Sequence, residues 1–285
     1  MAKTATSPSM SAALADGSPA RPVARVRSTP ARLAWSIIPP AALLIIVLGG
    51  WELLVRTEVV SPIIVAPPSD TFSALIDLVQ SPTFPKNFFT TAAEAVIGGI
   101  LGLLGGLLLG IASSLSPFLS RTLYPYIVFF QGLPKVVLAP VFVTWFGFGI
   151  SSKIVMVIVL TFFPLYINTV LGLSTTDKNA MSLMRSYGAS KKDIFFKLQL
   201  PSALPSIFAG VKTSASFALI GSIVAEFLGA RNGLGYLMLQ NNFQLRTDRV
   251  YALIVILAFM GLFVYLSVEY LYRKVVFWED HGALR

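Results

Sequence analysis

The stretch that decides the fold is Asp177–Pro205, which reads DKNAMSLMRSYGASKKDIFFKLQLPSALP. It is polar, and long apolar runs lie on both sides of it. Its basic residues are Lys178, Arg185, Lys191, Lys192 and Lys197. This pattern predicts two short helices and a break between them, placed outside the apolar runs. We name the stretch 177–205 the elbow.

The ends of both short helices can be predicted from single residues. The first helix is expected from Lys178 to about Tyr187, ending at Gly188, because glycine tolerates the left-handed backbone that terminates helices. Ser190 begins a second helix, and Asp193 three residues later fits a capping box in the favourable first turn. Pro201 is expected to end that helix, because proline lacks the N–H donor and disfavours helix in the preceding residue.

The elbow resembles the cytoplasmic signature of the permease subunits of bacterial ATP-binding-cassette (ABC) importers, which is E-A-A, three residues, Gly, nine residues and I-x-L-P. Here Gly188 is followed by nine residues and then by Leu198-Gln199-Leu200-Pro201. The first half departs from the signature, since Ser182-Leu183-Met184 stands where Glu-Ala-Ala is expected. The alternative interpretation is an ordinary cytoplasmic loop, which would not require this spacing.

The resemblance implies that the elbow docks into a groove on a separate ATPase subunit. The residues at the matching positions are then expected to couple the permease to that ATPase: Ser182, Met184, Arg185, Gly188, Ala189, Leu198, Leu200 and Pro201.

Composition independently indicates a membrane protein. Hydrophobic residues make up 55% of the 285 residues and charged residues 12%, whereas soluble domains carry about 25% charged residues. The chain lacks cysteine, which excludes disulfides, thiolate catalysis and iron–sulfur sites. Its one histidine is His281, so a histidine-based metal site is not expected. We expect no cofactor.

Six apolar stretches predict an all-α integral membrane protein with six transmembrane helices, and the resemblance implies the type I ABC importer permease fold. The expected spans are 33–55, 92–111, 124–145, 154–171, 207–228 and 250–272. Together with the elbow as a cytoplasmic coupling element they form one permease domain, 33–278. Residues 1–32, rich in Ala, Ser and Pro, are expected to be a disordered basic arm, and 279–285 a short tail.

The first apolar stretch also fits a secretory signal peptide, since a basic region precedes it. Its length of about 20 residues matches a helix that crosses a bilayer. It also lacks a cleavage site with small residues. We therefore expect an uncleaved anchor.

The distribution of basic residues predicts the orientation. Fourteen of the 22 Lys and Arg residues lie in the N-terminal arm, the 112–121 loop, the elbow and the tail, and six lie in the three opposite loops. Because cytoplasmic loops carry the excess of Lys and Arg, the elbow and both termini are expected to be cytoplasmic. The resemblance to bacterial importers places the chain in the cytoplasmic (inner) membrane.

The chain lacks the G-x-x-x-x-G-K-[ST] phosphate loop, so it is not expected to bind or hydrolyse ATP by that device. The resemblance implies that two ATPase subunits, a second permease copy and an extracytoplasmic binding protein complete the transporter. The alternative is a stand-alone secondary transporter driven by an ion gradient. That alternative requires acidic relays inside the spans, and the chain offers Glu94 and Glu226 near span ends, where pairing or solvation is expected.

The resemblance extends over residues 60–278 and includes LPKVVLAPVFVTWFGFG, FFPLYINTVLGL and VAEFLGARNGLGYLM. These runs are similar to the nitrate, sulfonate and taurine branch of the permeases, which also imports pyrimidine precursors of thiamine. The resemblance therefore implies a small solute of this kind, and ligand binding by the cognate binding protein would identify it.

Polar residues within the spans are candidates for the translocation pathway. Lys135 lies midway along the third span, where an ionisable side chain is expensive and usually functional. It is expected to attract an anion, and its alternatives are a carboxylate partner on another helix or a helix end that reaches a cytoplasmic cavity. Gln131 and Asn168 are the other pathway candidates, with hydrogen bonds between helices as their alternative. Lys212 is expected to extend to the cytoplasmic surface.

The second span carries a glycine at every fourth position, which places a smooth ridge on one helix face. Such a ridge lets another helix approach closely, so a packing role is expected. The glycines are Gly98, Gly102, Gly106 and Gly110.

Overall fold

The computed structural model describes residues 30–278, with side chains from Ile38 onward, and this part of the chain contains helices and no strand. The expected arm up to residue 29 and the tail 279–285 lie outside the described residues. The helices are α1 (Pro30–Arg56), α2 (Pro68–Gln80), α3 (Phe84–Leu115), α4 (Pro117–Gly132), η2 (Lys135–Leu138, a 3₁₀ turn), α5 (Ala139–Phe146), α6 (Ile150–Ser174), α7 (Lys178–Ser186), α8 (Lys191–Ile194), η3 (Phe195–Gln199, a π turn), α9 (Leu200–Phe227), α10 (Leu234–Phe243) and α11 (Thr247–Val275).

Five helical segments are long and apolar enough to cross a membrane: Ile38–Arg56, Phe84–Leu115, Ile150–Ser174, Lys191–Phe227 and Thr247–Val275. The pair Pro117–Gly132 and Lys135–Phe146 qualifies as a sixth if it is taken as one span, although the two helices are bent by 91° at their break. The expected third span, 124–145, falls on this bent pair. Pro125 lies inside α4 without ending it, and the break occurs at Leu133 and Pro134.

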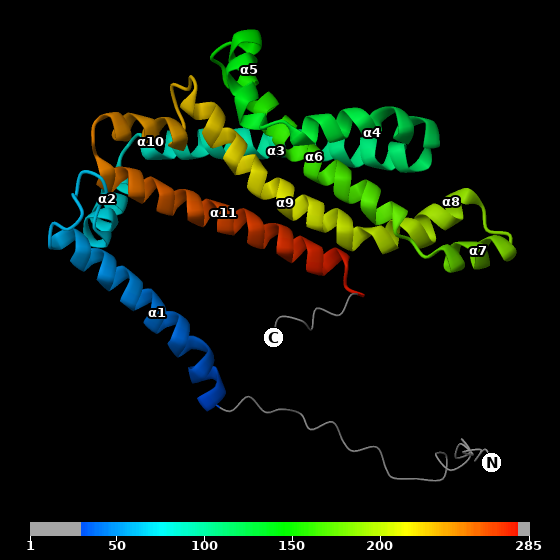
Figure 1. Ribbon diagram of the computed structural model, residues 1–285, viewed down its shortest axis with the longest axis horizontal. Helices are drawn as coiled ribbons and strands as arrows, with labels where there is room; N and C mark the ends of the chain where they lie inside the picture. Colours follow the sequence, from blue (N-terminus) through cyan, green and yellow to red (C-terminus); the bar gives the residue numbers. More distant parts are fainter. Residues whose placement is uncertain (1–29, 279–285) are drawn as a thin grey trace, which may run out of the picture. The chain divides into compact units, whose positions relative to one another are not determined.

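The chain divides into two units, residues 1–50 and 51–285. In the second unit α3, α6 and α9 pack against one another, and α11 lies along α9 (Figure 1). The buried apolar side chains between these helices include Val157, Leu165, Leu219 and Leu253. The elbow helices α7 and α8 lie at one end of this bundle, and α10 lies at the other (Figure 1). The sequence signal behind α3, α6 and α9 is their near-continuous apolar composition, which is typical of buried or membrane helices.

The four glycines of the predicted ridge lie where α3 contacts α6. A Cβ added at Gly106 would lie 2.6 Å from the Phe162 carbonyl oxygen, and one at Gly102 would overlap the Thr161 hydroxyl. Added Cβ atoms at Gly98 and Gly110 would lie 2.6 Å and 2.8 Å from the Cβ atoms of Val157 and Thr169. The absence of side chains at every fourth position therefore brings the backbones of the two helices into contact.

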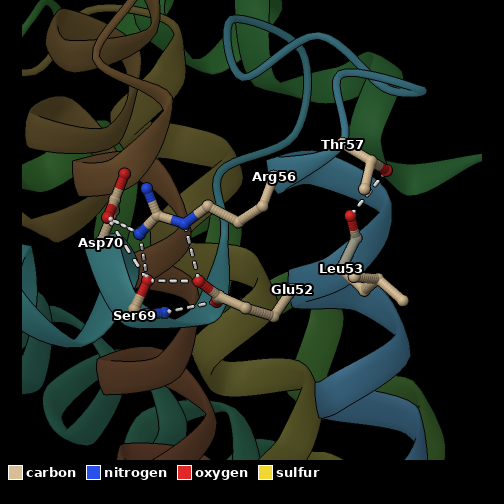
Figure 2. Close-up of polar contacts among 6 residues, drawn as sticks. All are labelled: Glu52, Leu53, Arg56, Thr57, Ser69 and Asp70. Atoms are coloured by element: carbon tan, nitrogen blue, oxygen red, sulfur yellow. Dashed lines mark hydrogen bonds and ion pairs between the residues drawn. The ribbon is translucent and has the colours of Figure 1, made fainter.

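The end of α1 fixes the start of α2 through a small polar network within the second unit (Figure 2). The cap residue of α2 is Pro67, whose side chain accepts no hydrogen bond. The Glu52 carboxylate of α1 caps the start of α2 instead. It accepts from the Ser69 backbone N–H at 3.1 Å and from the Ser69 hydroxyl at 2.7 Å. Arg56 bridges Glu52 and Asp70, at 3.0 Å from each carboxylate. A carboxylate at a helix N-terminus also complements the helix dipole.

The contact between α3 and α6 yields a paired test. Gly106→Ala should lower the free energy of unfolding by about 1–3 kcal/mol, because its new methyl group meets the backbone of α6. Gly105→Ala is the control on the same helix, because its nearest neighbour is the Phe162 ring at an ordinary 3.5 Å. It should be neutral or up to about 1 kcal/mol stabilising, from the higher helix propensity of alanine. Unfolding of both variants in detergent measures the difference, and equal effects would contradict the close approach at Gly106.

Candidate functional site

The first elbow helix ends in a Schellman motif, as the glycine suggested. Gly188 has a φ of 76°. Its N–H donates to the Arg185 carbonyl at 2.9 Å, and the Ala189 N–H donates to the Met184 carbonyl at 3.0 Å. These two bonds satisfy the last carbonyls of α7. The left-handed backbone at Gly188 thus sets the direction in which the chain leaves α7.

The second elbow helix begins with the predicted capping box. The Asp193 N–H donates to the Ser190 hydroxyl at 3.2 Å, and the Ser190 N–H donates to the Asp193 carboxylate at 3.3 Å. Lys197 lies one turn later and forms an ion pair with Asp193 at 2.6 Å. The direction of both elbow helices is therefore determined by local residues.

The prediction that Pro201 ends the second helix is wrong. After α8 the chain makes the π turn Phe195–Gln199 and continues directly into α9, with Pro201 in its first turn. The Leu200 N–H donates to the Phe195 carbonyl, five residues back. A wider π turn loosens the helix ahead of the proline, whose missing N–H is tolerated in the first turn of a helix. The elbow is thus joined to a span by a continuous but irregular helix.

The elbow exposes large apolar side chains next to basic ones. Leu183, Tyr187 and Phe196 are 58%, 84% and 63% exposed, and Arg185 of the same elbow is exposed as well. On the inner side, Ile194 is buried. We name Leu183, Arg185, Tyr187 and Phe196 the elbow face. The three apolar members were not among the residues singled out from the sequence, although large apolar residues in a polar stretch are a usable signal.

The eight residues predicted to couple to an ATPase do not share one surface. Those exposed on the elbow are Ser182, Arg185 and Gly188, and those partly buried are Met184, Ala189, Leu198, Leu200 and Pro201. Leu200 packs against a core cluster that includes Leu165 and Ile207. The sequence signature therefore contains both candidate contact residues and residues that anchor the elbow to the bundle.

The three residues predicted for the pathway line one cavity of about 390 Å³. Gln131 and Lys135 come from α4 and η2, and Asn168 comes from α6. The rest of the lining is mostly apolar: Leu160, Phe163, Pro164, Ile167, Thr213 and Phe217. We name this space the lysine cavity. It combines one cation, two amides and two aromatic rings, which suits a small polar solute with an apolar part.

Within the described residues, Lys135 has no carboxylate partner. Its ammonium lies 5.1 Å from the centre of the Phe163 ring and donates to the Gln131 carbonyl at 3.3 Å. A cation over an aromatic face is stabilised without losing its charge. The described residues therefore do not contain the alternative, an ion pair between Lys135 and a carboxylate on another helix. The Lys135 ammonium lines the cavity.

Asn168 and Lys212 have defined partners within the bundle. The Asn168 side chain donates to the Pro164 carbonyl of its own helix at 2.8 Å, and the link to α9 is made by its backbone carbonyl, which accepts from Ser206 at 2.9 Å. Lys212 pairs with Glu269 of α11 at 2.6 Å, and its side chain is partly exposed. The partner of Lys212 lies on a distant helix, so the sequence alone does not identify it.

The sequence left open whether Glu94 and Glu226 are solvated or bonded to protein partners. Both side chains are buried and bonded to other helices. Glu94 accepts from Lys153 at 2.6 Å, and Glu226 accepts from Thr91 at 2.6 Å. Between residues 30 and 278, no group of three or more His, Cys, Asp or Glu residues is arranged to hold a metal ion.

The helical spans, the elbow and the lysine cavity define a multi-pass membrane permease. Residues 102–277 match the family described as binding-protein-dependent transport system inner membrane component. The chain belongs to this family, and it is the permease subunit of an ABC importer rather than a stand-alone transporter.

Individual relatives agree with this assignment. The chain is 32% identical to the formylaminopyrimidine transport permease protein ThiX of Halalkalibacterium halodurans, over 86% of this chain and 98% of that protein. It is 26% identical to the taurine transport system permease protein TauC of Escherichia coli, over 85% and 89% of the two chains. A chain of the methionine ABC transporter MetNI in an inward-facing conformation shares the fold, with a TM-score of 0.60, 20% identity and coverage of 68% of this chain and 96% of that chain.

Proposed function

We propose that two copies of this permease form a pathway for a small organic solute across the bacterial cytoplasmic membrane, with the lysine cavity as part of that pathway. A binding protein delivers the solute to the outer face. Two copies of a separate ATPase drive transport through the elbow, and the permease itself carries no ATPase site. The observation that carries this proposal is a lysine that has no carboxylate partner among residues 38–278 and lines a cavity whose helices lead directly to the elbow.

The elbow face supports docking to another protein. It contains exposed apolar side chains and the exposed Arg185, and such a mixture of anchors and charge is typical of protein–protein interfaces. The elbow continues through the π turn into α9, which lines the lysine cavity with Thr213 and Phe217. A push on the elbow would therefore reach the cavity along one helix.

The lysine cavity supports a solute with an anionic or electron-rich group. Lys135 supplies the charge, Asn168 and Gln131 supply amides, and Phe163 and Phe217 offer flat apolar surfaces. The relatives are named for formylaminopyrimidine and taurine, both small molecules. We propose a solute of this size and polarity.

The charge of Lys135 is open to a direct test. Lys135→Met should lower solute uptake by the assembled transporter about 10- to 100-fold, because it removes a charged hydrogen-bond donor from the pathway. Complex assembly and basal ATP hydrolysis should persist, since Lys135 pairs with no carboxylate in the part of the chain that the structure describes. Lys135→Arg is the control that keeps the charge and should retain most uptake. Wild-type uptake by Lys135→Met would remove the lysine from the proposed pathway.

The elbow can be tested through its backbone. Gly188→Val should insert into the membrane normally but lose co-purification with the ATPase or its stimulation by the loaded binding protein. The reason is that a β-branched residue at a φ of 76° is strained by about 1 kcal/mol or more and re-aims α8.

Gly147→Val is a matched control for that variant. Gly147 has a φ of 78°, and at both glycines an added Cβ would meet no atom within 4 Å. It lies between α5 and α6, outside the elbow. The control should keep the ATPase bound, and equal losses in both variants would show that general strain, not the elbow, is responsible.

The proposed orientation rests on the excess of Lys and Arg in the elbow and at the termini. A reporter that is active only in the cytoplasm should work when fused after Arg285 or within residues 1–30. The same reporter should be silent in the loop 231–249. Activity in that loop would overturn the proposed orientation, although it would leave the elbow test unaffected.

A further inference from the structure

A buried ionic cluster lies at the end of α9 opposite the elbow. Its members are Glu94 of α3, Lys153 of α6 and Glu226 of α9, which are 0%, 6% and 1% exposed. Lys153 bonds to one oxygen of Glu94 at 2.6 Å, and the Glu94 and Glu226 carboxyl groups are close enough to interact. Charged residues are almost never this deeply buried unless they are paired.

The local helix structure does not explain the positions of Lys153 and Glu226. Lys153 lies in the first turn of α6, and Glu226 lies in the last turn of α9. The helix dipole favours the opposite arrangement, with anions at N-termini and cations at C-termini. Both residues are therefore held by tertiary contacts.

The main tertiary contact is with the turn that follows α9. Glu226 accepts from the Gly235 N–H at 2.6 Å and from the Thr91 hydroxyl at 2.6 Å. Thr91 in turn accepts from the Leu234 N–H at 2.8 Å, and Asn87 accepts from the Gly233 N–H at 2.7 Å. The first N–H groups of α10 are thus capped by α3 and α9, since the helix has no side-chain cap of its own.

The glycines of this turn make room for the Glu226 carboxylate. A Cβ at Gly233 would overlap that carboxylate, and a Cβ at Gly235 would lie 2.8 Å from one of its oxygens. Gly229, at the start of the turn, lies against the Phe148 ring in the connection between α5 and α6. The turn therefore touches the segment that follows the bent helix pair carrying Lys135. We name residues 228–235 the glycine turn.

The hydrogen bonds of the cluster are not all satisfied. The cluster brings two carboxyl groups to one lysine, and the second oxygen of Glu94 is buried without a hydrogen-bond partner among the described residues. Glu226, by contrast, uses both oxygens. An unsatisfied buried acceptor costs free energy, so Glu94 is the least well satisfied member of the cluster.

We propose that Glu226, through its bonds to the Gly235 N–H and to Thr91, is the positioning residue that holds the glycine turn closed, and that the turn is released in the transport cycle when the loaded binding protein engages this face. Lys153, which bonds to Glu94, is the one cation among the three members of the cluster. The release step rests on the proposed orientation, which puts the glycine turn on the outer side.

Hydrogen exchange measures this arrangement directly, because the backbone amides of residues 233–235 donate the hydrogen bonds that hold the glycine turn. In full-length protein in lipid nanodiscs, Glu226→Gln should raise their exchange rate about tenfold or more, because an amide has one acceptor oxygen where the carboxylate has two. Lys153→Met should act in the same direction. Glu94→Gln should leave the exchange rate unchanged, because none of the N–H groups of residues 233–235 donates to Glu94. The same chemical change at two members of one cluster thus has different expected effects.

Glu269→Gln is the matched control, since the Glu269 carboxylate on α11 also bonds at 2.6 Å, in its case to Lys212 and away from the glycine turn. It should not change exchange at residues 233–235. Equal effects of Glu226→Gln and Glu269→Gln, or rapid exchange of these amides in the wild type, would overturn the assignment of Glu226.

The release step needs a functional measurement in the assembled transporter. Glu226→Gln should reduce several-fold the ratio of ATP hydrolysis with the loaded binding protein to hydrolysis without it, while the ATPase stays bound. A normal ratio in a variant whose glycine turn exchanges rapidly would overturn the release step. The reporter fusions test the orientation separately, so a wrong orientation and a wrong cluster give different results.

Discussion

Direct backbone contact between α3 and α6 is the constraint on which the arrangement of the second unit depends. Within a lipid bilayer, apolar side chains gain little by leaving lipid for protein, so helices associate through close packing and hydrogen bonds. The glycines of α3 provide that packing, with Gly106 facing the Phe162 carbonyl. Further along, Gly172 and Gly210 let α6 and α9 meet in the same way. Three spans thus form a rigid centre.

This centre places the two candidate sites on shared helices. The lysine cavity is lined by α6 and α9 and closed by α4 and η2, and the elbow follows α6 and precedes α9. Because both sites belong to helices that are packed together, the proposed coupling between them needs no separate linker. The π turn Phe195–Gln199 is the irregular point along that route, and such turns are frequent at functional sites.

Polar residues within the spans follow a consistent physical rule. Lys212 pairs with Glu269, and Lys153 pairs with Glu94, as expected where an unpaired charge is costly. Lys135 is the described intramembrane lysine without a carboxylate partner, and it faces a cavity. The contrast between paired and unpaired lysines is what distinguishes a structural charge from a candidate for solute contact.

The sequence by itself determined the features that arise from neighbouring residues. The Schellman turn at Gly188, the capping box at Ser190 and the period-four glycine ridge all depend on residues within a few positions of one another. The tertiary structure decided the partners: Lys153 meets Glu94 across 59 residues, and Thr91 meets Glu226 across 135. It also decided the 91° bend between α4 and the η2–α5 segment, and the helix that continues through Pro201. The physical reason is that caps and periodicity are local, whereas buried charges and bent helices are stabilised by whichever distant segment folds against them.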